Sequence, residues 1–234
     1  MKKFVLLATL TAFTFGCKEK TGPKRHNEIP INQRIDALIK EATAATDDNK
    51  KAALYGELSE LFIEKGDYRQ AMLNARLGEK ANPTQKQCLT SVAEAQLAEG
   101  KLDEAAATLK DVLQRHPAYG RAHFVQGNLL ASRKDFAGAL KSYATAEKDK
   151  FADQRLLLNM GGAALRANKA ADAVKIYDRL LATAPELAEA HLGAGIASQK
   201  AGKKGDAKKH FEKYIVLAPN SSEASRVKIW LKAL

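Results

Sequence analysis

A spacing of 34 residues between prolines is the feature that most limits how this chain can fold. Pro83 and Pro117 lie 34 residues apart, Pro117 and Pro185 lie 68 apart, and Pro185 and Pro219 lie 34 apart, with Phe151 at the missing place. Counting each of these as position 32 divides the chain, without insertions, into the segments 52–85, 86–119, 120–153, 154–187 and 188–221. A fixed period of this length is typical of stacked repeats, in which each repeat buries its apolar face against its neighbours.

Three further columns of the 34-residue frame support the same register. Position 20 is alanine in every segment: Ala71, Ala105, Ala139, Ala173 and Ala207. Position 8 is always small and position 24 is mostly large and apolar: Ser59, Ala93, Gly127, Gly161 and Gly195 for the first, and Ala75, Leu109, Tyr143, Tyr177 and Phe211 for the second. Small residues allow two helices to approach closely, so we expect positions 8 and 20 to lie at a helix–helix contact and position 24 to fill the adjacent groove.

Each segment also carries signals for two helix ends. Position 15 is occupied by Gly66, Gly100, Lys134, Asn168 and Gly202. Glycine and asparagine readily adopt the left-handed conformation that ends a helix, and a proline at position 32 prevents the second helix from continuing. The frame therefore predicts two helices joined by a turn in every segment.

The combined pattern of a large residue at position 4, small at 8, alanine at 20, aromatic at 24 and proline at 32 resembles the tetratricopeptide repeat (TPR). It covers five segments of 34 residues, or 170 of the 234 residues. His123 and His191 at position 4, and Gln96 and Ser198 at position 11, depart from it. The resemblance implies an all-α fold, a right-handed superhelical solenoid of about five helix–turn–helix repeats.

A solenoid must cover the apolar faces of its terminal repeats. Residues 31–47 carry Ile35, Leu38 and Ile39 at helical spacing, which predicts an N-terminal capping helix. Residues 222–234 carry Val227, Trp230 and Leu231 as one apolar stripe, which predicts a C-terminal capping helix. The preceding segment 220–223 has the pattern of a capping box.

The first residues have the layout of a bacterial export signal. Lys2 and Lys3 precede an uncharged run, 4–15, that is too short to span a bilayer. Gly16 and Cys17 resemble a lipoprotein processing site, although Thr14 stands where leucine is usual. The resemblance implies a signal peptide at 1–16, acylation of Cys17, palmitate included, a polar tether at 17–30, and an outer-membrane lipoprotein facing the periplasm. The alternative is cleavage after Gly16 without acylation, which would leave a soluble periplasmic protein.

The sequence contains no residue pattern that indicates catalysis. None of the five histidines has a metal-ligand partner one helical turn away, and Gly161-Gly162 lies within a predicted helix rather than in a phosphate-binding loop. Cys88 is expected to be a buried free thiol, or to pair with Cys17 if that residue is not acylated. We expect a non-enzymatic protein that uses no cofactor and no metal.

In the TPR family, the first helix of each pair lines a concave partner-binding face. Carrying those positions over gives the expected partner-binding residues Arg121, Phe124, Asn128, Arg155, Leu158, Asn159, Arg166 and Gln199. Asn128 and Asn159 match the two asparagines of the carboxylate-clamp TPR proteins. The basic clamp positions are Phe124, Glu189 and Gly193 here, so we do not expect capture of an acidic C-terminal tail. The sequence favours a mixed groove, with arginines as polar anchors and Phe124 and Leu158 as apolar contacts; the alternative is a solvated face.

Charge is concentrated at the C-terminal end of a chain whose formal net charge is +11. Residues 200–234 hold nine basic and three acidic side chains. Such a region suits an anionic surface such as lipid or peptidoglycan, or is simply a solvated helix face. Nucleic acid is not expected, because the basic stretch lacks aromatic residues for base stacking.

These features together predict a protein–protein interaction scaffold or adaptor of the bacterial cell envelope. TPR lipoproteins that assist pilus or secretin assembly have a similar organisation, which is an analogy from architecture alone. The alternative is a carrier or sensor of a small apolar ligand held within the superhelix.

Overall fold

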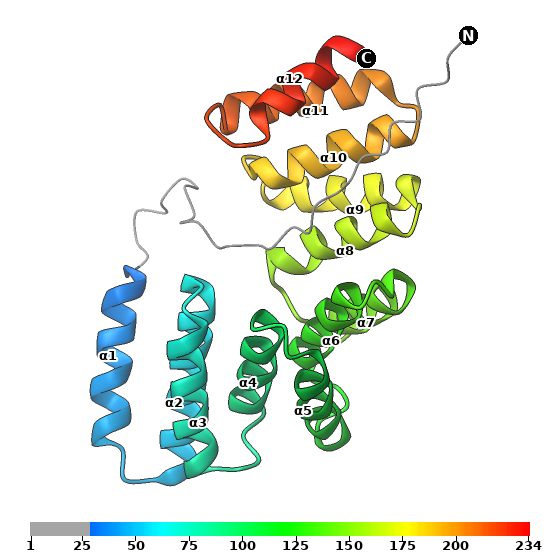
Figure 1. Ribbon diagram of the computed structural model, residues 1–234. Coiled ribbons are helices and arrows are strands. Elements are labelled where there is room, and N and C mark those ends of the chain that lie inside the picture. The colour runs from blue at the N-terminus through cyan, green and yellow to red at the C-terminus, as the bar shows by residue number, and fades with distance from the viewer. Residues whose placement is uncertain (1–28) are drawn as a thin grey trace.

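The computed structural model describes residues 29–234; the predicted export signal, Cys17 and most of the predicted tether lie outside the described residues. The described chain contains twelve helices and no strand, as the sequence predicted (Figure 1). The helices are α1 (Ile31–Ala44), α2 (Asp48–Lys65), α3 (Tyr68–Ala81), α4 (Lys86–Ala98), α5 (Leu102–Arg115), α6 (Gly120–Ser132), α7 (Phe136–Lys148), α8 (Gln154–Arg166), α9 (Ala170–Thr183), α10 (Ala188–Lys200), α11 (Lys204–Leu217) and α12 (Ala224–Ala233).

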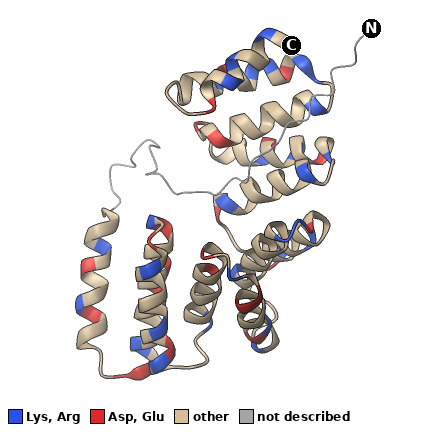
Figure 2. Ribbon diagram, in the orientation of Figure 1, with Lys and Arg blue, Asp and Glu red and all other residues tan. Residues whose placement is uncertain are grey.

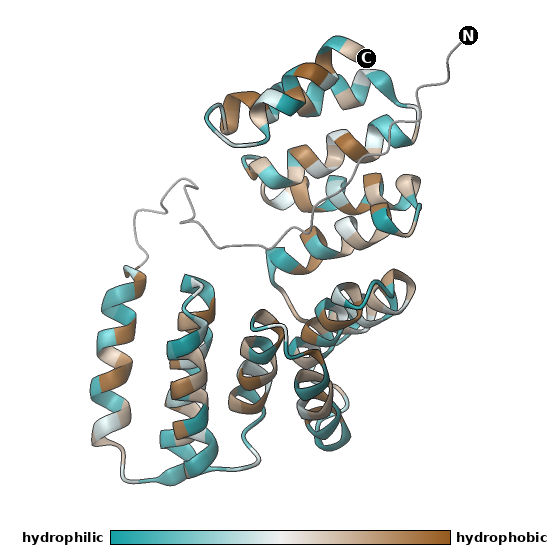
Figure 3. Cartoon of the chain, viewed as in Figure 1, coloured by the Kyte–Doolittle hydropathy of each residue, from teal (hydrophilic) through white to brown (hydrophobic). Residues whose placement is uncertain are grey.

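Ten of these helices form five antiparallel pairs, from α2 with α3 to α10 with α11. The first helices α4, α6, α8 and α10 begin at residues 86, 120, 154 and 188, at intervals of one 34-residue period. Second helices such as α5 and α11 bury one side and leave the other in solvent, whereas the first helices α4 and α10 are buried on most sides. Apolar and polar positions mix along the ribbon (Figure 3). No helix of the described residues is long and apolar enough to cross a membrane.

The packing within a pair depends on the small residue at position 8 facing the large residue at position 24. A Cβ atom added to Gly127 would lie 2.3 Å from the Tyr143 ring, and one added to Gly161 would lie 2.6 Å from the Tyr177 ring. Gly195 stands in the same relation to Phe211, at 2.5 Å. Because real Cβ atoms do not approach rings so closely, these aromatic side chains occupy the space that glycine leaves free. The expected close contact at position 8 is confirmed.

The turns within the pairs use the left-handed conformation at position 15 in all five repeats. Gly66, Gly100 and Gly202 have φ angles of 76°, 78° and 77°, and Lys134 and Asn168 have φ angles of 64° and 58°. Lys134 adopts this conformation although it is neither glycine nor asparagine. The packing of the two helices that it joins therefore imposes the left-handed backbone conformation at position 15.

The stack curves because successive first helices contact one another, whereas successive second helices do not. α2 contacts α4, α4 contacts α6, α6 contacts α8 and α8 contacts α10, whereas α3, α5, α7, α9 and α11 make no such contacts among themselves. The first helices therefore form the inner layer of the curve and the second helices the outer layer. In Figure 1 the helix axes turn progressively from α1 to α12.

Single helices cover both ends of the stack. α1 packs on α2 through Ile35 and Leu58, and α12 packs through Val227 and through Trp230, whose ring centroid lies 5.5 Å from that of Phe211. The expected capping box before α12 is wrong in detail: the N-cap residue, Glu223, makes no side-chain capping bond. Ser221 instead forms a hydroxyl–hydroxyl hydrogen bond of 2.8 Å with Tyr214.

Gly127→Ala tests the position-8 contact. We expect it to lower the free energy of unfolding by about 1–3 kcal/mol, because the added methyl group overlaps the Tyr143 ring. Gly205→Ala on α11 is the matched control, since nothing lies within 4 Å of its Cβ position, and it should leave stability unchanged or slightly raised through helix propensity. Urea denaturation followed by circular dichroism measures both; equal effects at the two sites would contradict the packing.

Candidate partner-binding face

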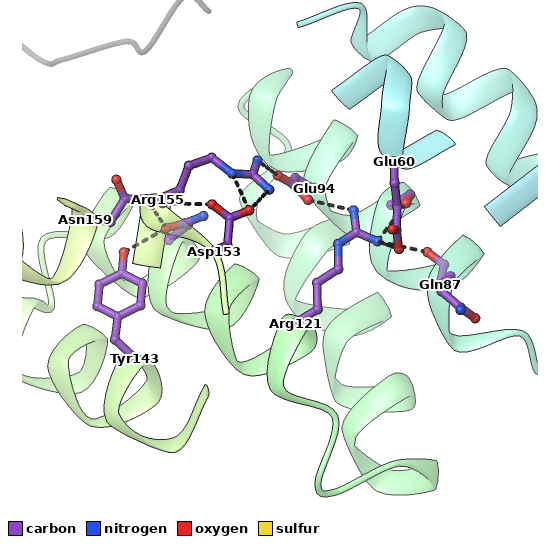
Figure 4. Close-up of polar contacts among 10 residues, drawn as sticks. Glu60, Gln87, Glu94, Arg121, Tyr143, Asp153, Arg155 and Asn159 are labelled. Carbon is purple, nitrogen blue, oxygen red and sulfur yellow. Dashed lines mark hydrogen bonds and ion pairs between the residues drawn. The ribbon is translucent and has the colours of Figure 1, made fainter. Parts of the chain in front are cut away.

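The inner face of the stack carries a chain of ion pairs across four first helices (Figure 4). The Arg121 guanidinium on α6 donates to Glu60 Oε1 at 2.8 Å and to Glu94 Oε2 at 3.0 Å. Arg155 on α8 donates to the other oxygen of Glu94 at 3.3 Å and to Asp153 Oδ2 at 2.7 Å. We call this chain of five side chains the inner ladder; it connects α2, α4, α6 and α8.

The inner ladder is periodic. Glu60 and Arg121 are 61 residues apart, and so are Glu94 and Arg155. Each pair joins position 9 of one repeat to position 2 of the repeat after next, so the second pair is the first one moved by one repeat. The contact fastens alternate repeats to each other across the concave side.

The series stops at the third repeat. The residues equivalent to the two pairs are Asn128 and Glu189, and no bond joins them within residues 29–234. Asn128 Oδ1 instead accepts hydrogen bonds from Asn159 Nδ2 and from the Tyr143 hydroxyl, each at 2.8 Å (Figure 4). Charge pairs therefore occupy the N-terminal half of the inner face, and the amide pair of Asn128 and Asn159 follows at the end of the inner ladder.

Arg121 is a structural residue rather than an exposed anchor. Only 7% of it is exposed, and Ser91 Oγ accepts a further bond from it at 3.1 Å. Burial lowers the pKa of Arg121, but the carboxylates of Glu94 and Glu60 outweigh burial, so the pKa is raised and the guanidinium stays charged. The expectation that Arg121 anchors a partner is thus corrected, because its donors are held by the inner ladder.

The expected apolar contact from Phe124 is also wrong. Phe124 is 1% exposed, stacks on Phe151 with ring centroids 5.0 Å apart, and lies 6.0 Å from the Tyr143 ring. The Arg155 guanidinium covers its ring at 5.5 Å. Position 5 of this repeat belongs to the core, because the ring fills the junction between α6, α7 and the segment that precedes α8.

The other expected residues lie toward the C-terminal half of the inner face. Asn128, Leu158 and Asn159 are half-buried, and Arg166 and Gln199 are exposed. The Arg166 guanidinium lies 5.6 Å from the Phe136 ring centroid. The structure joins Asn128 to Asn159 directly, whereas Cys17 lies outside the described residues.

Sequence reasoning missed Glu94, which joins the two halves of the inner ladder. Its signal was present: acidic residues occupy position 9 in the first two repeats, and arginine occupies position 2 in the third and fourth. Recognising it requires knowing that position 9 meets position 2 two repeats later.

A second missed contact joins His191 on α10 to His210 on α11, 19 residues away, with their Nδ1 atoms 3.1 Å apart. His191 Nε2 donates to the carbonyl oxygen of Pro185 at 2.9 Å, so in the neutral pair its Nδ1 accepts a hydrogen bond from His210 Nδ1–H. Burial lowers the pKa of His210, and His191 lowers it further, against the raising effect of Asp178 and Asp206.

The described residues offer little for chemistry. They contain no group of three or more His, Cys, Asp or Glu side chains that could hold a metal ion. Cys88 is a buried free thiol, and burial, followed by the charges of Glu60 and Glu79, raises its pKa to about 12. A thiol of this kind is inert as a nucleophile at neutral pH.

Two hollows on the described part of the stack lie beside α6. One of about 390 Å³ lies between α5 and α6 and is lined by Leu109, Leu113, Leu129 and Leu130, with Lys110 and Arg133 among its polar residues. The other, of about 340 Å³, lies beside the inner ladder and is lined by Glu60, Tyr119 and Arg121 among others.

Glu94→Gln tests the inner ladder. We expect the free energy of unfolding to fall by about 1–3 kcal/mol, because a buried carboxylate that serves two arginines is lost. Glu99→Gln is the control: its pair with Lys101 is exposed and should contribute less than about 1 kcal/mol. Urea denaturation compares them, and equal losses would show that the ladder contributes no more than a surface pair.

His210→Gln tests the histidine pair. Because the pKa of His210 is lowered in the folded protein, the unfolded chain binds a proton at higher pH, so stability falls as pH drops through about 6.5. We expect the variant to lose less stability between pH 7.5 and 5.5 than the parent chain. Urea denaturation at a series of pH values measures the difference, and an NMR titration of the His210 ring checks the direction of the shift; a pKa above the ordinary value would refute the assignment.

Comparison with known proteins gives a family and a fold. A family model of the tetratricopeptide repeat matches residues 93–154 and 158–224, which together exceed half of the chain. No curated protein matches the chain.

Solved structures that share the fold have low sequence identity. MamA of Desulfovibrio magneticus is 19% identical, with 73% of this chain and 97% of that chain covered, at a TM-score of 0.58. A TPR protein of Thermus thermophilus is 18% identical, with 78% and 100% covered, at a TM-score of 0.61. YrrB, described as a TPR protein with an unusual peptide-binding site, is 15% identical, with 86% and 100% covered, at a TM-score of 0.58. At these identities the likeness concerns the fold alone.

Proposed function

The chain belongs to the tetratricopeptide repeat family, and we propose that it is a non-enzymatic scaffold that binds an extended protein segment on the inner face of α6, α8 and α10. The fold supports the general role, because stacked helix pairs offer a long curved surface and no catalytic centre. The choice of α6, α8 and α10 as the binding face depends on where the inner ladder ends.

The amide pair of Asn128 and Asn159 carries the proposal. Asn128 Oδ1 accepts two hydrogen bonds, and Asn159 Nδ2 donates one of them. Within the described residues, Asn128 Nδ2 and Asn159 Oδ1 therefore remain able to bond a ligand. An extended peptide backbone presents one donor and one acceptor per residue, which is the complement of this pair. The Tyr143 hydroxyl fixes the orientation of Asn128, so the pair is arranged before a ligand arrives.

The surroundings of the amide pair leave room for side chains. A Cβ atom at Gly162, three residues along α8 from Asn159, would meet only the Tyr177 hydroxyl, at 3.9 Å. Leu158 and Ile196 are half-buried apolar residues of the inner helices, and Gln199 is exposed. The face therefore suits a segment with mixed apolar and polar side chains, in contrast to the charge pairs of the inner ladder.

The proposed setting is the bacterial cell envelope. It rests on the predicted signal at 1–16 and on acylation of Cys17, both outside the described residues. Acyl chains at Cys17 would hold the repeats near a membrane, where the protein would act in the assembly of an envelope complex such as a pilus or secretin. YrrB, which shares the fold and whose description names a peptide-binding site, supports peptide binding on such a solenoid.

Site-specific photo-crosslinking tests the proposal in intact cells. A crosslinker at exposed Gln199 on the inner layer should trap a protein partner, and one at exposed Gln114 on α5 of the outer layer should not. Asn128→Ala combined with Asn159→Ala should reduce the Gln199 product at least several-fold, because two backbone hydrogen bonds are lost. Circular dichroism confirms that the double variant is folded. A product that persists in the double variant, or that forms equally at Gln114, would disprove the assignment.

The alternative function, a carrier or sensor of a small apolar ligand, has one observation in its favour. The hollow between α5 and α6 is lined by four leucines and measures about 390 Å³, within the range of small-molecule pockets. Native mass spectrometry of the purified chain separates the two functions: a bound small molecule supports the carrier, and a stoichiometric protein supports the scaffold.

A further inference from the structure

We infer that the outer face of α12, with the adjoining part of α11, is a docking surface for an anionic lipid bilayer. This inference goes beyond the proposed partner-binding face, because it concerns other helices, and it does not require acylation of Cys17.

α12 has two distinct sides. Ala224 and Val227 are buried, and Trp230 faces Phe211 within the cap of the solenoid. The opposite side presents Ile229, which is 66% exposed. Arg226 and Lys232 lie three residues before and after Ile229, so both flank it on the same helical face. A large apolar side chain thus stands in solvent between two cations.

The neighbouring helix, α11, also exposes one large apolar side chain and a lysine on the same face. Val216 near the end of α11 is 73% exposed, and exposed Lys209 lies two turns earlier on the same face. The other exposed large apolar side chains of the described residues all lie in the N-terminal part: Ile29, Ile39, Leu73 and Leu77. Within residues 200–234, the exposed large apolar side chains are therefore Val216 and Ile229.

Positive charge on these helices is mostly uncompensated (Figure 2). Residues 200–234 hold nine basic and three acidic side chains, and two of the three carboxylates pair within the region, Glu223 with Arg226 at 2.8 Å and Glu212 with Lys208 at 3.9 Å. No carboxylate of the described chain lies within ion-pairing distance of Lys209, Lys228 or Lys232. These lysines are available to an anionic partner.

A lipid surface fits this face better than an acidic protein segment. The two hollows described above are lined by residues of other helices, and α11 and α12 expose isolated aliphatic side chains among lysines. Cations surrounding isolated exposed aliphatic residues suit a bilayer, where the lysines meet headgroup phosphates and the aliphatic side chains enter the boundary with the acyl chains. Docking through α12 would leave the inner face of α6, α8 and α10 accessible.

Vesicle binding by the proposed mature chain, residues 17–234, carrying Cys17→Ser tests the inference, because neither acylation nor the apolar run 4–15 can then contribute to binding. Trp230 is the only tryptophan and lies on α12, so its emission reports contact at this helix. We expect binding to vesicles that contain phosphatidylglycerol, with quenching of Trp230 by brominated acyl chains, and little binding to pure phosphatidylcholine. Lys228→Glu with Lys232→Glu should weaken binding about tenfold or more, and Ile229→Ser should reduce both binding and quenching.

The matched controls lie on other helices. Lys141→Glu with Lys148→Glu on α7 makes the same change of charge, and Leu77→Ser on α3 removes another exposed aliphatic side chain; both should bind like the parent. Equal losses in test and control variants, or equal binding to neutral vesicles, would overturn the inference. So would binding to poly-glutamate with none to anionic vesicles, since the partner would then be an acidic polypeptide. Crosslinking at Gln199 is read independently, so either proposal can fail alone.

Discussion

The close approach of two helices within each repeat is the constraint on which the rest of the structure depends. Tyr143, Tyr177 and Phe211 fill space that exists only because their partners at position 8 have no side chain. This contact sets the distance between the helices of a pair, and the left-handed residue at position 15 sets the turn between them. Repetition of the unit then aligns the first helices as an inner layer, and because only that layer is in continuous contact, the stack curves.

Curvature in turn creates contacts that no single repeat contains. The inner ladder joins residues 61 positions apart because the concave side brings alternate repeats within reach of one arginine side chain. Burying these charges is tolerable only because Arg121 and Glu94 satisfy each other and have further partners. The inner ladder therefore stabilises the curve of the first four repeats and pairs the charges on their inner face.

The end of the inner ladder marks the surface to which the proposed partner binding is assigned. Position 9 is an acid in the first two repeats, but it is Asn128 in the third repeat and Gly162 in the fourth. These two replacements leave an oriented amide pair beside open space. The features of the chain thus differ along its length. Charge pairs connect the helices of the N-terminal half, and the inner face of the C-terminal half presents the side-chain amides of Asn128 and Asn159. Positive charge is concentrated on the outer face of the last two helices.

The sequence by itself determined the all-α repeat fold, its register, the turn positions and the two capping helices, because each depends on contacts within one period or on local backbone preferences, as at Gly127 and Gly66. It also placed Asn128 and Asn159 on the inner face. It could not show that Arg121 and Phe124 are buried, or that His191 meets His210, because a helical position fixes which way a side chain points but not what lies opposite. That depends on the superhelical curve, which decides which repeats meet across the concave side. Only the tertiary structure therefore decided which inner residues hold the solenoid together and which remain free for a partner.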